Sequence, residues 1–328
     1  MYFVNSPVYD PYFNLALEEY LFIGKGNEDA FFMLWQNDNT IVVGRNQNTI
    51  EEINQDFVRE HNVNVIRRNT GDGAVYHDLG NINFSFIQNN NDISNIDFSI
   101  FTKPVIAALE KIGVKAELSG RNDLTIEGKK FSGNSQLIKG NRVLHHGTIL
   151  FNADLDFIQK ALNVKPDKIQ SKGIKSVRSR VTNISEYLDQ EVSVEEFKQI
   201  LIENMFKQNE LKEYKLTEED LAAVNKLKEE KFSKWEWNYG KFPQYSIRKD
   251  RKFAYGGITI SMEVKKGHIT DFAIQGDFFG NGEIAELEEM LIGVAVNEEA
   301  VRAALEDVDL NHYISGMKPE ELVEMIVY

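Results

Sequence analysis

The chain has no cysteine among its 328 residues. It therefore forms no disulfide, offers no thiolate to a metal ion and has no thiol nucleophile for covalent catalysis. It also contains no apolar run near the ~20 residues that a membrane-spanning helix needs. The N-terminal stretch "MYFVNSPVYDPYF" lacks the basic and apolar regions of a signal peptide. We therefore expect a cytoplasmic protein without membrane contact.

Positive charge is scarce as well. Lys and Arg number 37 against 51 Asp and Glu, which gives a formal net charge of -14 and a pI near 5.0. Such a surface repels the phosphates of nucleic acids, so we expect no nucleic-acid partner. A small anionic ligand can still bind where basic residues are concentrated, and three stretches of the chain hold such concentrations.

Hydrophobic periodicity predicts a mixture of strands and helices. Asp10 followed by Pro11 predicts an N-cap and the first position of a helix that ends near Ile23. Polar and apolar residues alternate in "NINFSFIQ" (81–88), which predicts a half-buried strand. Further strands are expected at 31–35, 40–44, 63–68, 114–118 and within 123–152, and helices at 49–61, 103–112, 154–162, 193–208 and 217–232. This order favours an α+β fold with mixed or antiparallel sheets flanked by helices over a doubly wound fold.

The pattern changes after the connector "KWEWNYGKFPQYSI" (234–247). Residues 252–278 predict two or three strands with a turn at Lys266-Gly267, and helices follow near 283–292, 297–306 and 318–326. We therefore expect a large domain at 1–245 and a small α+β domain at 246–328.

The first basic stretch is "RRNTGDGAVYHDLGN" (67–81). Gly71 and Gly73 permit positive φ and close approach of the backbone to a ligand, and successive N–H groups can form an anion-binding nest. Arginine binds carboxylates and phosphates with two parallel hydrogen bonds. Because a strand precedes them, only one of Arg67 and Arg68 should point into a site. A plain turn with two surface arginines explains the stretch equally well, and Asp72 fits an anion site poorly.

The second stretch is "GRNDLTIEGKKFSGN" (120–134). Asp123 can hold a divalent metal or orient a base, and Lys129 and Lys130 beside a hairpin turn should face opposite ways. Ser132-Gly133 permits close approach of a ligand. Taken alone, the stretch also fits a hairpin with solvated lysines.

The third stretch, "SKGIKSVRSRVTN" (171–183), holds four basic residues and no acid. It suits contact with a polyphosphate, although a solvated basic loop would look the same. Between the second and third stretches, "LHHGTILFN" (144–152) places a histidine pair in a predicted strand, where one histidine should face a pocket. Taken alone, each histidine is better explained by a structural role.

Together these stretches resemble, in order, the motif series of the lipoate–protein ligases. "PYFNLALEEYLF", "TIVVGRNQN" and "WEWNYGKFP" resemble other parts of the same family, and the tail with "YGGITISMEVKKGHITDFAIQGDFF" resembles its small accessory domain. The resemblance covers nearly the whole chain. It implies a biotin/lipoate ligase-like catalytic domain that uses ATP to convert lipoate to lipoyl-adenylate and then acylates a lysine of a lipoyl domain.

The resemblance also implies roles for individual residues. Lys130 corresponds to the family's essential lysine, and Asp123 would lie near Mg²⁺. The residues implied to bind lipoate or the adenylate are Arg68, Thr70, Gly71, Gly73, Ala74, Val75, Tyr76, Asn81, Asp123, Ser132, Gly133, His146, Lys172 and Arg178. The implied cofactors are ATP and Mg²⁺, the acid is lipoate or octanoate, and the acceptors are lipoyl domains of 2-oxoacid dehydrogenase complexes and the glycine cleavage H protein.

Three alternatives bear on this interpretation. A lipoyl or octanoyl transferase of similar fold works through a cysteine thioester, which this chain cannot form. The basic GRGRRGR-type loop of biotin ligases is absent. A non-catalytic paralogue stays open because Asp72 replaces the middle one of three glycines in the family motif, although Lys130, Asp123 and the basic loop favour an active ligase.

Overall fold

The computed structural model of the chain describes residues 1–25, 29–89, 98–120, 122–163, 180–206, 211–240 and 247–328. These residues form two compact units. The first comprises Met1–Val43, Thr49–Arg68 and Ala74–Tyr239, and the second comprises Gly44–Asn48, Asn69–Gly73 and Gly240–Tyr328. The boundary expected at residue 245 lies outside the described residues and stays a prediction.

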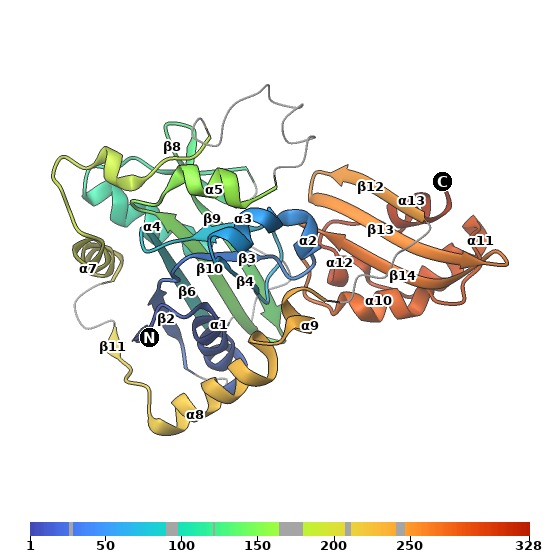
Figure 1. Cartoon of the computed structure of the whole chain (residues 1–328), viewed down its shortest axis with the longest axis horizontal. Helices are drawn as coiled ribbons and strands as arrows, with labels where there is room; N and C mark the ends of the chain where they lie inside the picture. Colours follow the sequence, from blue (N-terminus) through green and yellow to red (C-terminus); the bar gives the residue numbers. More distant parts are fainter. Residues whose placement is uncertain (26–28, 90–97, 121, 164–179, 207–210, 241–246) are drawn as a thin grey trace. The chain divides into compact units, whose positions relative to one another are not determined.

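An eight-stranded mixed sheet forms the centre of the first unit (Figure 1). Its order is β11-β1-β2-β6-β10-β9-β8-β7, with β1 parallel to both of its neighbours and the other pairs antiparallel. The strands are β1 (Tyr2–Asn5), β2 (Phe31–Trp35), β6 (Asn81–Asn89), β7 (Glu117–Ser119), β8 (Asp123–Ile126), β9 (Lys129–Lys139), β10 (Arg142–Leu150) and β11 (Lys212–Glu213). The predicted α+β class with sheets flanked by helices is confirmed.

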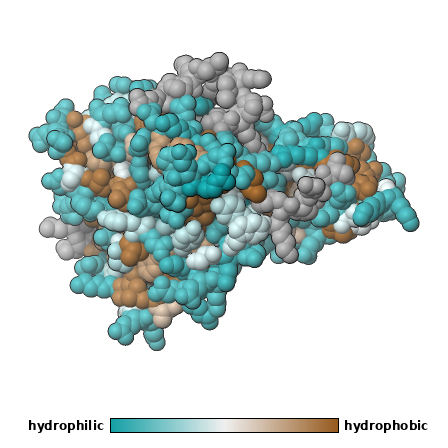
Figure 2. Space-filling view, in the orientation of Figure 1, coloured by the Kyte–Doolittle hydropathy of each residue, from teal (hydrophilic) through white to brown (hydrophobic). Residues whose placement is uncertain are grey.

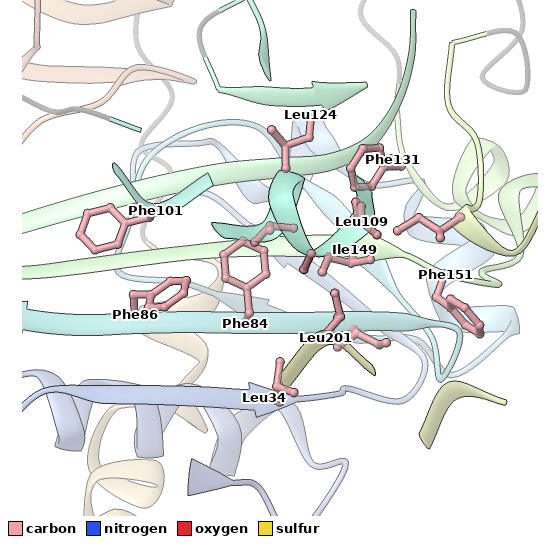
Figure 3. Packing of buried hydrophobic residues seen from close by; sticks show 14 of the residues in the cluster. Leu34, Phe84, Phe86, Phe101, Leu109, Leu124, Phe131, Ile149, Phe151 and Leu201 are labelled. Carbon is pink, nitrogen blue, oxygen red and sulfur yellow. The ribbon is translucent and has the colours of Figure 1, made fainter. Parts of the chain in front are cut away.

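Apolar side chains fill one face of this sheet. Phe84 and Phe86 of β6 point toward Phe101 of helix α4 (Ser99–Lys111), and Leu201 of helix α7 (Val194–Met205) belongs to the same cluster (Figure 3). These helices therefore cover the face from which Phe84 projects.

The opposite face of the central strand is buried too. Asn81, Asn83 and Ser85 are at most 1% exposed, so the prediction of a half-buried strand at 81–88 is wrong. The alternation that was predicted is present, but its polar side lies inside the unit and not against solvent. A buried row of polar side chains is costly unless it has partners, so this face is where a site is expected.

A second, three-stranded sheet has the order β4-β3-β5, with β3 (Thr40–Val43), β4 (Asn64–Arg67) and β5 (Val75–His77). The neighbouring segments 31–35 and 40–44 are both strands, as predicted, but they belong to different sheets. Val43 and Val65 of this sheet share a cluster with Tyr76, and Phe157 of helix α5 (Leu155–Ala161) packs against it.

The helices of the first unit begin largely where the sequence indicates. Asp10 caps α1 (Pro11–Glu19), which continues as the π-helical turn η1 (Tyr20–Gly24). Thr217 and Asp220 form the predicted capping box of α8 (Glu218–Leu227). The remaining elements are η3 (Ile184–Tyr187), η4 (Lys228–Phe232) and α9 (Trp235–Asn238).

The single helix expected at 49–61 is wrong. The structure has two short helices, α2 (Thr49–Glu52) and α3 (Gln55–Glu60). Ile53 is drawn into a β-bridge with Leu162, and Asn54 caps the second helix by accepting the N–H of Phe57 at 3.3 Å. A tertiary pairing and a new cap together interrupt the helix.

The second unit is built on a three-stranded antiparallel sheet, β12 (Ile247–Phe253), β13 (Gly256–Lys265) and β14 (His268–Gly276). The predicted turn at Lys266-Gly267 joins β13 and β14, and both of its residues have positive φ. The helices are α10 (Ile284–Leu291), α11 (Glu298–Leu305), α12 (Leu310–Tyr313) and α13 (Pro319–Val327), and the sequence did not indicate α12.

The face seen in Figure 2 is mainly hydrophilic, with apolar residues in small groups. Among the described residues, no helix combines the length and the apolar character that crossing a bilayer requires.

Candidate active site

An ion pair lies at the hairpin of β8 and β9. Lys130 Nζ is 2.7 Å from Asp123 Oδ1, and the two side chains are 36% and 38% exposed. A lysine held by a carboxylate and still open to solvent can meet an incoming anion. The pairing register of β8 and β9 shifts between Leu124 and Thr125, so the two strands are not a regular ladder between the paired side chains.

Gly133 leaves the space that this lysine uses. A Cβ built at Gly133 would lie 2.9 Å from Lys130 Nζ and 3.1 Å from its Cε. The glycine N–H donates to Thr148 Oγ1 on β10 at 3.3 Å. Glycine here is explained by the close approach of the ammonium group, since its φ is not in the left-handed region.

The two neighbouring lysines do face different surroundings. Lys129 lines a cleft of about 380 Å³ together with Val181, Asn183 and Glu186, among others, whereas Lys130 pairs with Asp123.

The end of the third basic stretch is joined to the same strand. Lys130 N–H donates to the carbonyl of Arg180 at 2.8 Å, and Thr182 N–H donates to the carbonyl of Lys130 at 2.9 Å. Lys172 and Arg178 lie outside the described residues.

A buried polar cluster occupies the face of β6 and β10 on which Gly133 also lies. Glu18 of α1, fully buried, accepts from Ser85 Oγ at 2.5 Å and is paired with His146 Nδ1 at 2.9 Å. Trp35 Nε1 donates to Ser85 Oγ at 3.0 Å. Of the two histidines on β10, His146 is therefore the one that faces this polar side.

Arg68 and His77 are near this cluster. Burial, Arg68 and His146, in that order, lower the pKa of His77 to about 3, so the ring is neutral at physiological pH. In the part of the chain that the structure describes, His77 Nε2, Glu18 Oε2 and Asn81 Oδ1 are buried without a hydrogen-bond partner. Buried polar atoms of this kind are normally satisfied, so they mark positions where a bound ligand or water would make hydrogen bonds.

Arg67, in contrast to its neighbour, is tied to the connector. Its Nε donates to the carbonyl of Trp237 at 2.9 Å, its N–H donates to Asn238 Oδ1 at 3.0 Å, and Trp237 Nε1 donates to its carbonyl at 2.8 Å. Arg68 Nη1 donates to the carbonyl of Val42. Arg67 thus bonds to the connector, whereas Arg68 bonds to β3.

The loop that contains Gly71 and Gly73 (Asn69–Gly73) belongs to the second unit. Asp72 is the loop residue with positive φ, at 78°, and neither adjacent glycine has one. Aspartate tolerates this conformation better than most residues, and its side chain is half-buried. A Cβ at Gly71 would overlap the carbonyl of Phe278, so that glycine is needed for close packing inside the second unit.

The other predicted site residues lie as follows. The ring of Tyr76 packs against that of Phe157 in a tilted arrangement, and its hydroxyl donates to Asn39 Oδ1 at 3.1 Å. Thr70 accepts the N–H of Arg45, and Ser132 accepts from Asn134 Nδ2 at 3.3 Å. Val75 packs with the cluster around α1, and Ala74 with the small sheet.

Two family models match this chain, one over its larger N-terminal part and one over its C-terminal part. Residues 10–206 match the family model of the lipoyl protein ligase A/B catalytic domain, and residues 242–326 match that of the bacterial lipoate protein ligase C-terminus. Lipoate–protein ligase 1 of Staphylococcus aureus strain Mu50 is 45% identical over 322 residues, which cover 98% of both chains. The lipoate-protein ligase LplJ of Bacillus subtilis strain 168 is 44% identical over 325 residues, with the same coverage.

The chain belongs to the lipoate–protein ligase family. Among solved structures, P. falciparum LipL1 in complex with lipoate matches with a TM-score of 0.78 at 26% identity, covering 99% of each chain. A lipoate-protein ligase A bound with ATP matches with a TM-score of 0.62 at 25% identity, covering 73% of this chain and 97% of that one. The resemblance seen in the sequence is confirmed, and the relatives favour an active ligase over the non-catalytic alternative.

Sequence reasoning missed part of the buried polar cluster. Glu18, Trp35, His77 and Ser85 were not assigned a role, although they form or border the buried polar cluster. The signal was the set of polar residues that alternate with apolar ones in the strand at 81–88. They would have indicated a buried polar face only if it had been known that other elements cover that side of the sheet.

No group of three or more His, Asp or Glu side chains arranged to hold a metal ion occurs among the described residues of the ligase. Asp123 is the residue that the resemblance places near Mg²⁺, and its carboxylate is 38% exposed. A single accessible carboxylate suits Mg²⁺, which proteins bind through one or two carboxylates together with substrate phosphates.

Proposed function

We propose that the chain activates lipoate with ATP, releasing pyrophosphate, and transfers the lipoyl group from lipoyl-AMP to a lysine of a lipoyl domain. The accessible Lys130–Asp123 pair in a chain without cysteine is the observation that supports this most directly. Transfer through a thiol ester is not possible here, so the acid must be activated by another route, and the family uses ATP.

Lys130 suits the first step. A carboxylate oxygen of lipoate attacks the α-phosphate, the bond from that phosphate to pyrophosphate breaks, and both reactants are anions. An ammonium group beside them offsets their repulsion and stabilises charge that develops at the α-phosphate. In the second step the acceptor amine attacks the acyl carbonyl and AMP leaves, and the same cation can polarise that carbonyl.

Asp123 would hold Mg²⁺ through its accessible carboxylate. When bound, the ion neutralises polyphosphate charge. Lys172 and Arg178, which carry positive charge in the basic stretch, are assigned to the phosphates from the motif.

The acyl chain is assigned to the buried face that carries His146. Trp35, Leu144 and Val75 belong to one apolar cluster on this side of the sheet, and an eight-carbon acid needs apolar neighbours. Arg68, which directly follows β4, and Asn81 of β6 would contact the carboxyl end or the adenylate. Thr70, Gly71 and Gly73 keep the roles that the motif predicts.

The expected acceptors are lipoyl domains of 2-oxoacid dehydrogenase complexes and the glycine cleavage H protein. Both lipoate and octanoate are candidate acids. Each acceptor is tested as a purified apo-protein with each acid.

The decisive experiment is the mass of an apo-lipoyl domain after incubation with the chain, lipoate, ATP and Mg²⁺. We expect a gain of one lipoyl group with wild type and with Lys129→Ala, and a large loss with Lys130→Ala. Lys129 is a matched control because it is the same residue type in the same hairpin without the Asp123 contact. No acylation by wild type with any acceptor and either acid would refute the proposal and revive the non-catalytic alternative.

A further inference from the structure

A series of buried hydrogen bonds joins β9, the strand that carries Lys130, to β10. It lies on the face of the sheet opposite to the one that Glu18 contacts. It begins at Gln136 on β9, whose Nε2 is 3.0 Å from Nδ1 of His145 on β10. His145 Nε2 is 3.2 Å from Asn134 Oδ1, two residues back along β9. The three side chains are 2%, 0% and 1% exposed, so these contacts are shielded from water.

The partners fix the protonation of His145. The amide N–H of Gln136 donates to one ring nitrogen, so the other must carry the proton that Asn134 Oδ1 accepts. Burial lowers the pKa of His145 well below its ordinary value, which keeps the ring neutral. The His145 ring stacks on the rings of Phe101 and Phe84, with ring centroids 4.8 Å and 5.9 Å away, so its N–H has a fixed direction.

Asn134 connects His145 to Asn122, the residue directly before β8, through hydrogen bonds. Its backbone N–H and its Nδ2 both donate to the carbonyl of Asn122 at 3.0 Å. Asn122 Nδ2 donates in return to the carbonyl of Asn134 at 2.6 Å. Asn122 directly precedes Asp123, which pairs with Gly133 across the hairpin.

We propose that His145 is a positioning residue for the activation step, acting through Asn134 and Asn122 on Asp123 and so on Lys130. This rests on the proposed function of the Lys130–Asp123 pair. The regular strand ladder is interrupted between the two members of that pair, because the register shifts between Leu124, next to Asp123, and Thr125, which lies opposite Lys130. The reciprocal hydrogen bonds between Asn122 and Asn134 hold the backbone next to Asp123, and the His145 ring holds the side chain of Asn134.

The test uses His145→Phe, which keeps an aromatic ring between Phe101 and Phe84 and deletes both ring nitrogens. Asn134→Asp is a second variant, which keeps the volume and the acceptor for His145 but places an oxygen against the carbonyl of Asn122. Phe197→Leu is the matched control, because Phe197 stacks on Phe151 in the same core at 4.4 Å and is not a member of the hydrogen-bond series.

The measurements are the unfolding free energy of each variant and the steady-state release of pyrophosphate from ATP with lipoate. For both network variants we expect kcat to fall about 10- to 100-fold while the KM for lipoate stays within about twofold. The control should keep its kcat at a similar loss of stability.

Two results would overturn the inference. One is a kcat for His145→Phe and Asn134→Asp equal to that of Phe197→Leu, which would make the series purely structural. The other is a rise in the KM for lipoate at unchanged kcat. Absence of pyrophosphate release from wild type with either acid is a different outcome, because it refutes the proposed function and with it any positioning role.

Discussion

Single residues decide the geometry around Lys130, and Gly133 offers the cleanest test. In Gly133→Ala the new Cβ would displace the lysine ammonium, which is the far end of a flexible side chain and can move at little cost to folding. We expect unchanged or slightly higher stability, since alanine is favoured over glycine within a strand. The rate of adenylate formation should fall about tenfold, equivalent to ~1.4 kcal/mol.

Stopped-flow measurement of pyrophosphate release beside urea unfolding checks this prediction for Gly133→Ala. Equal rates for the variant and wild type would show that the ammonium position does not matter.

Asp72 is the residue that fits the family motif least well, and its backbone conformation explains why an aspartate is tolerated there. Because its φ is 78°, we expect the position to need a residue that tolerates the left-handed region, while its charge has little effect. Asp72→Asn and Asp72→Gly should keep the KM for lipoate and ATP, and Asp72→Ala should lose about 1 kcal/mol of stability. Steady-state kinetics and chemical unfolding of the three variants test this, and a marked fall in KM for Asp72→Asn would instead assign the carboxylate an inhibitory charge.

At the scale of elements, a buried carboxylate joins α8 to η1, the turn that continues α1. Asp220, 1% exposed, accepts from Tyr20, Tyr214 and Lys25 at 2.5 to 2.7 Å. Burial opposes its ionisation, but the hydrogen bonds from Lys25 and Tyr214 prevail and lower the pKa of Asp220. This stability is present above the ordinary aspartate pKa and is lost as the pH falls through the lower folded value.

Asp220→Ala leaves a cation and two phenols without this partner, so we expect a loss of about 3 kcal/mol in the free energy of unfolding. Glu219→Ala, an exposed position in the same helical turn, is the control and should change it little. Urea titrations at pH 7 measure both, and equal effects would show that the carboxylate is not a structural link.

Local signals in the sequence predicted most elements but not how they are combined. The Asp10-Pro11 start, the Thr217–Asp220 box and the Lys266-Gly267 turn each depend on neighbouring residues, and all are present. The break of the helix at Ile53 depends on Leu162, more than a hundred residues away. The Glu18–His146 pair likewise joins distant segments, so no local pattern could have indicated it.

At the scale of the whole molecule, buried neutral histidines predict how stability depends on pH. Burial lowers the pKa of His77 to about 3 and that of His145 well below its ordinary value. As the pH falls below ~6.5, the unfolded chain binds protons at these positions and the folded chain does not. Stability should therefore decline from about pH 6.5 downward, by up to ~1.4 kcal/mol per pH unit for each histidine.

Urea titrations at pH 7.5, 6 and 5 measure this decline. His145→Phe should reduce the slope, whereas His268→Asn, at an exposed position, should leave it unchanged. A flat profile for wild type, or an equal slope in both variants, would contradict the assignment.

The central claim is that Lys130 carries out activation of the acid, and formation of lipoyl-AMP in a single turnover without acceptor tests it most directly. Enzyme in excess over lipoate is mixed with ATP and Mg²⁺, and lipoyl-AMP is quantified by mass spectrometry. We predict rapid formation by wild type and Lys129→Ala, and a rate at least about 100-fold lower for Lys130→Ala, equivalent to ~2.7 kcal/mol of lost transition-state stabilisation. Equal rates for the two lysine variants would contradict the account.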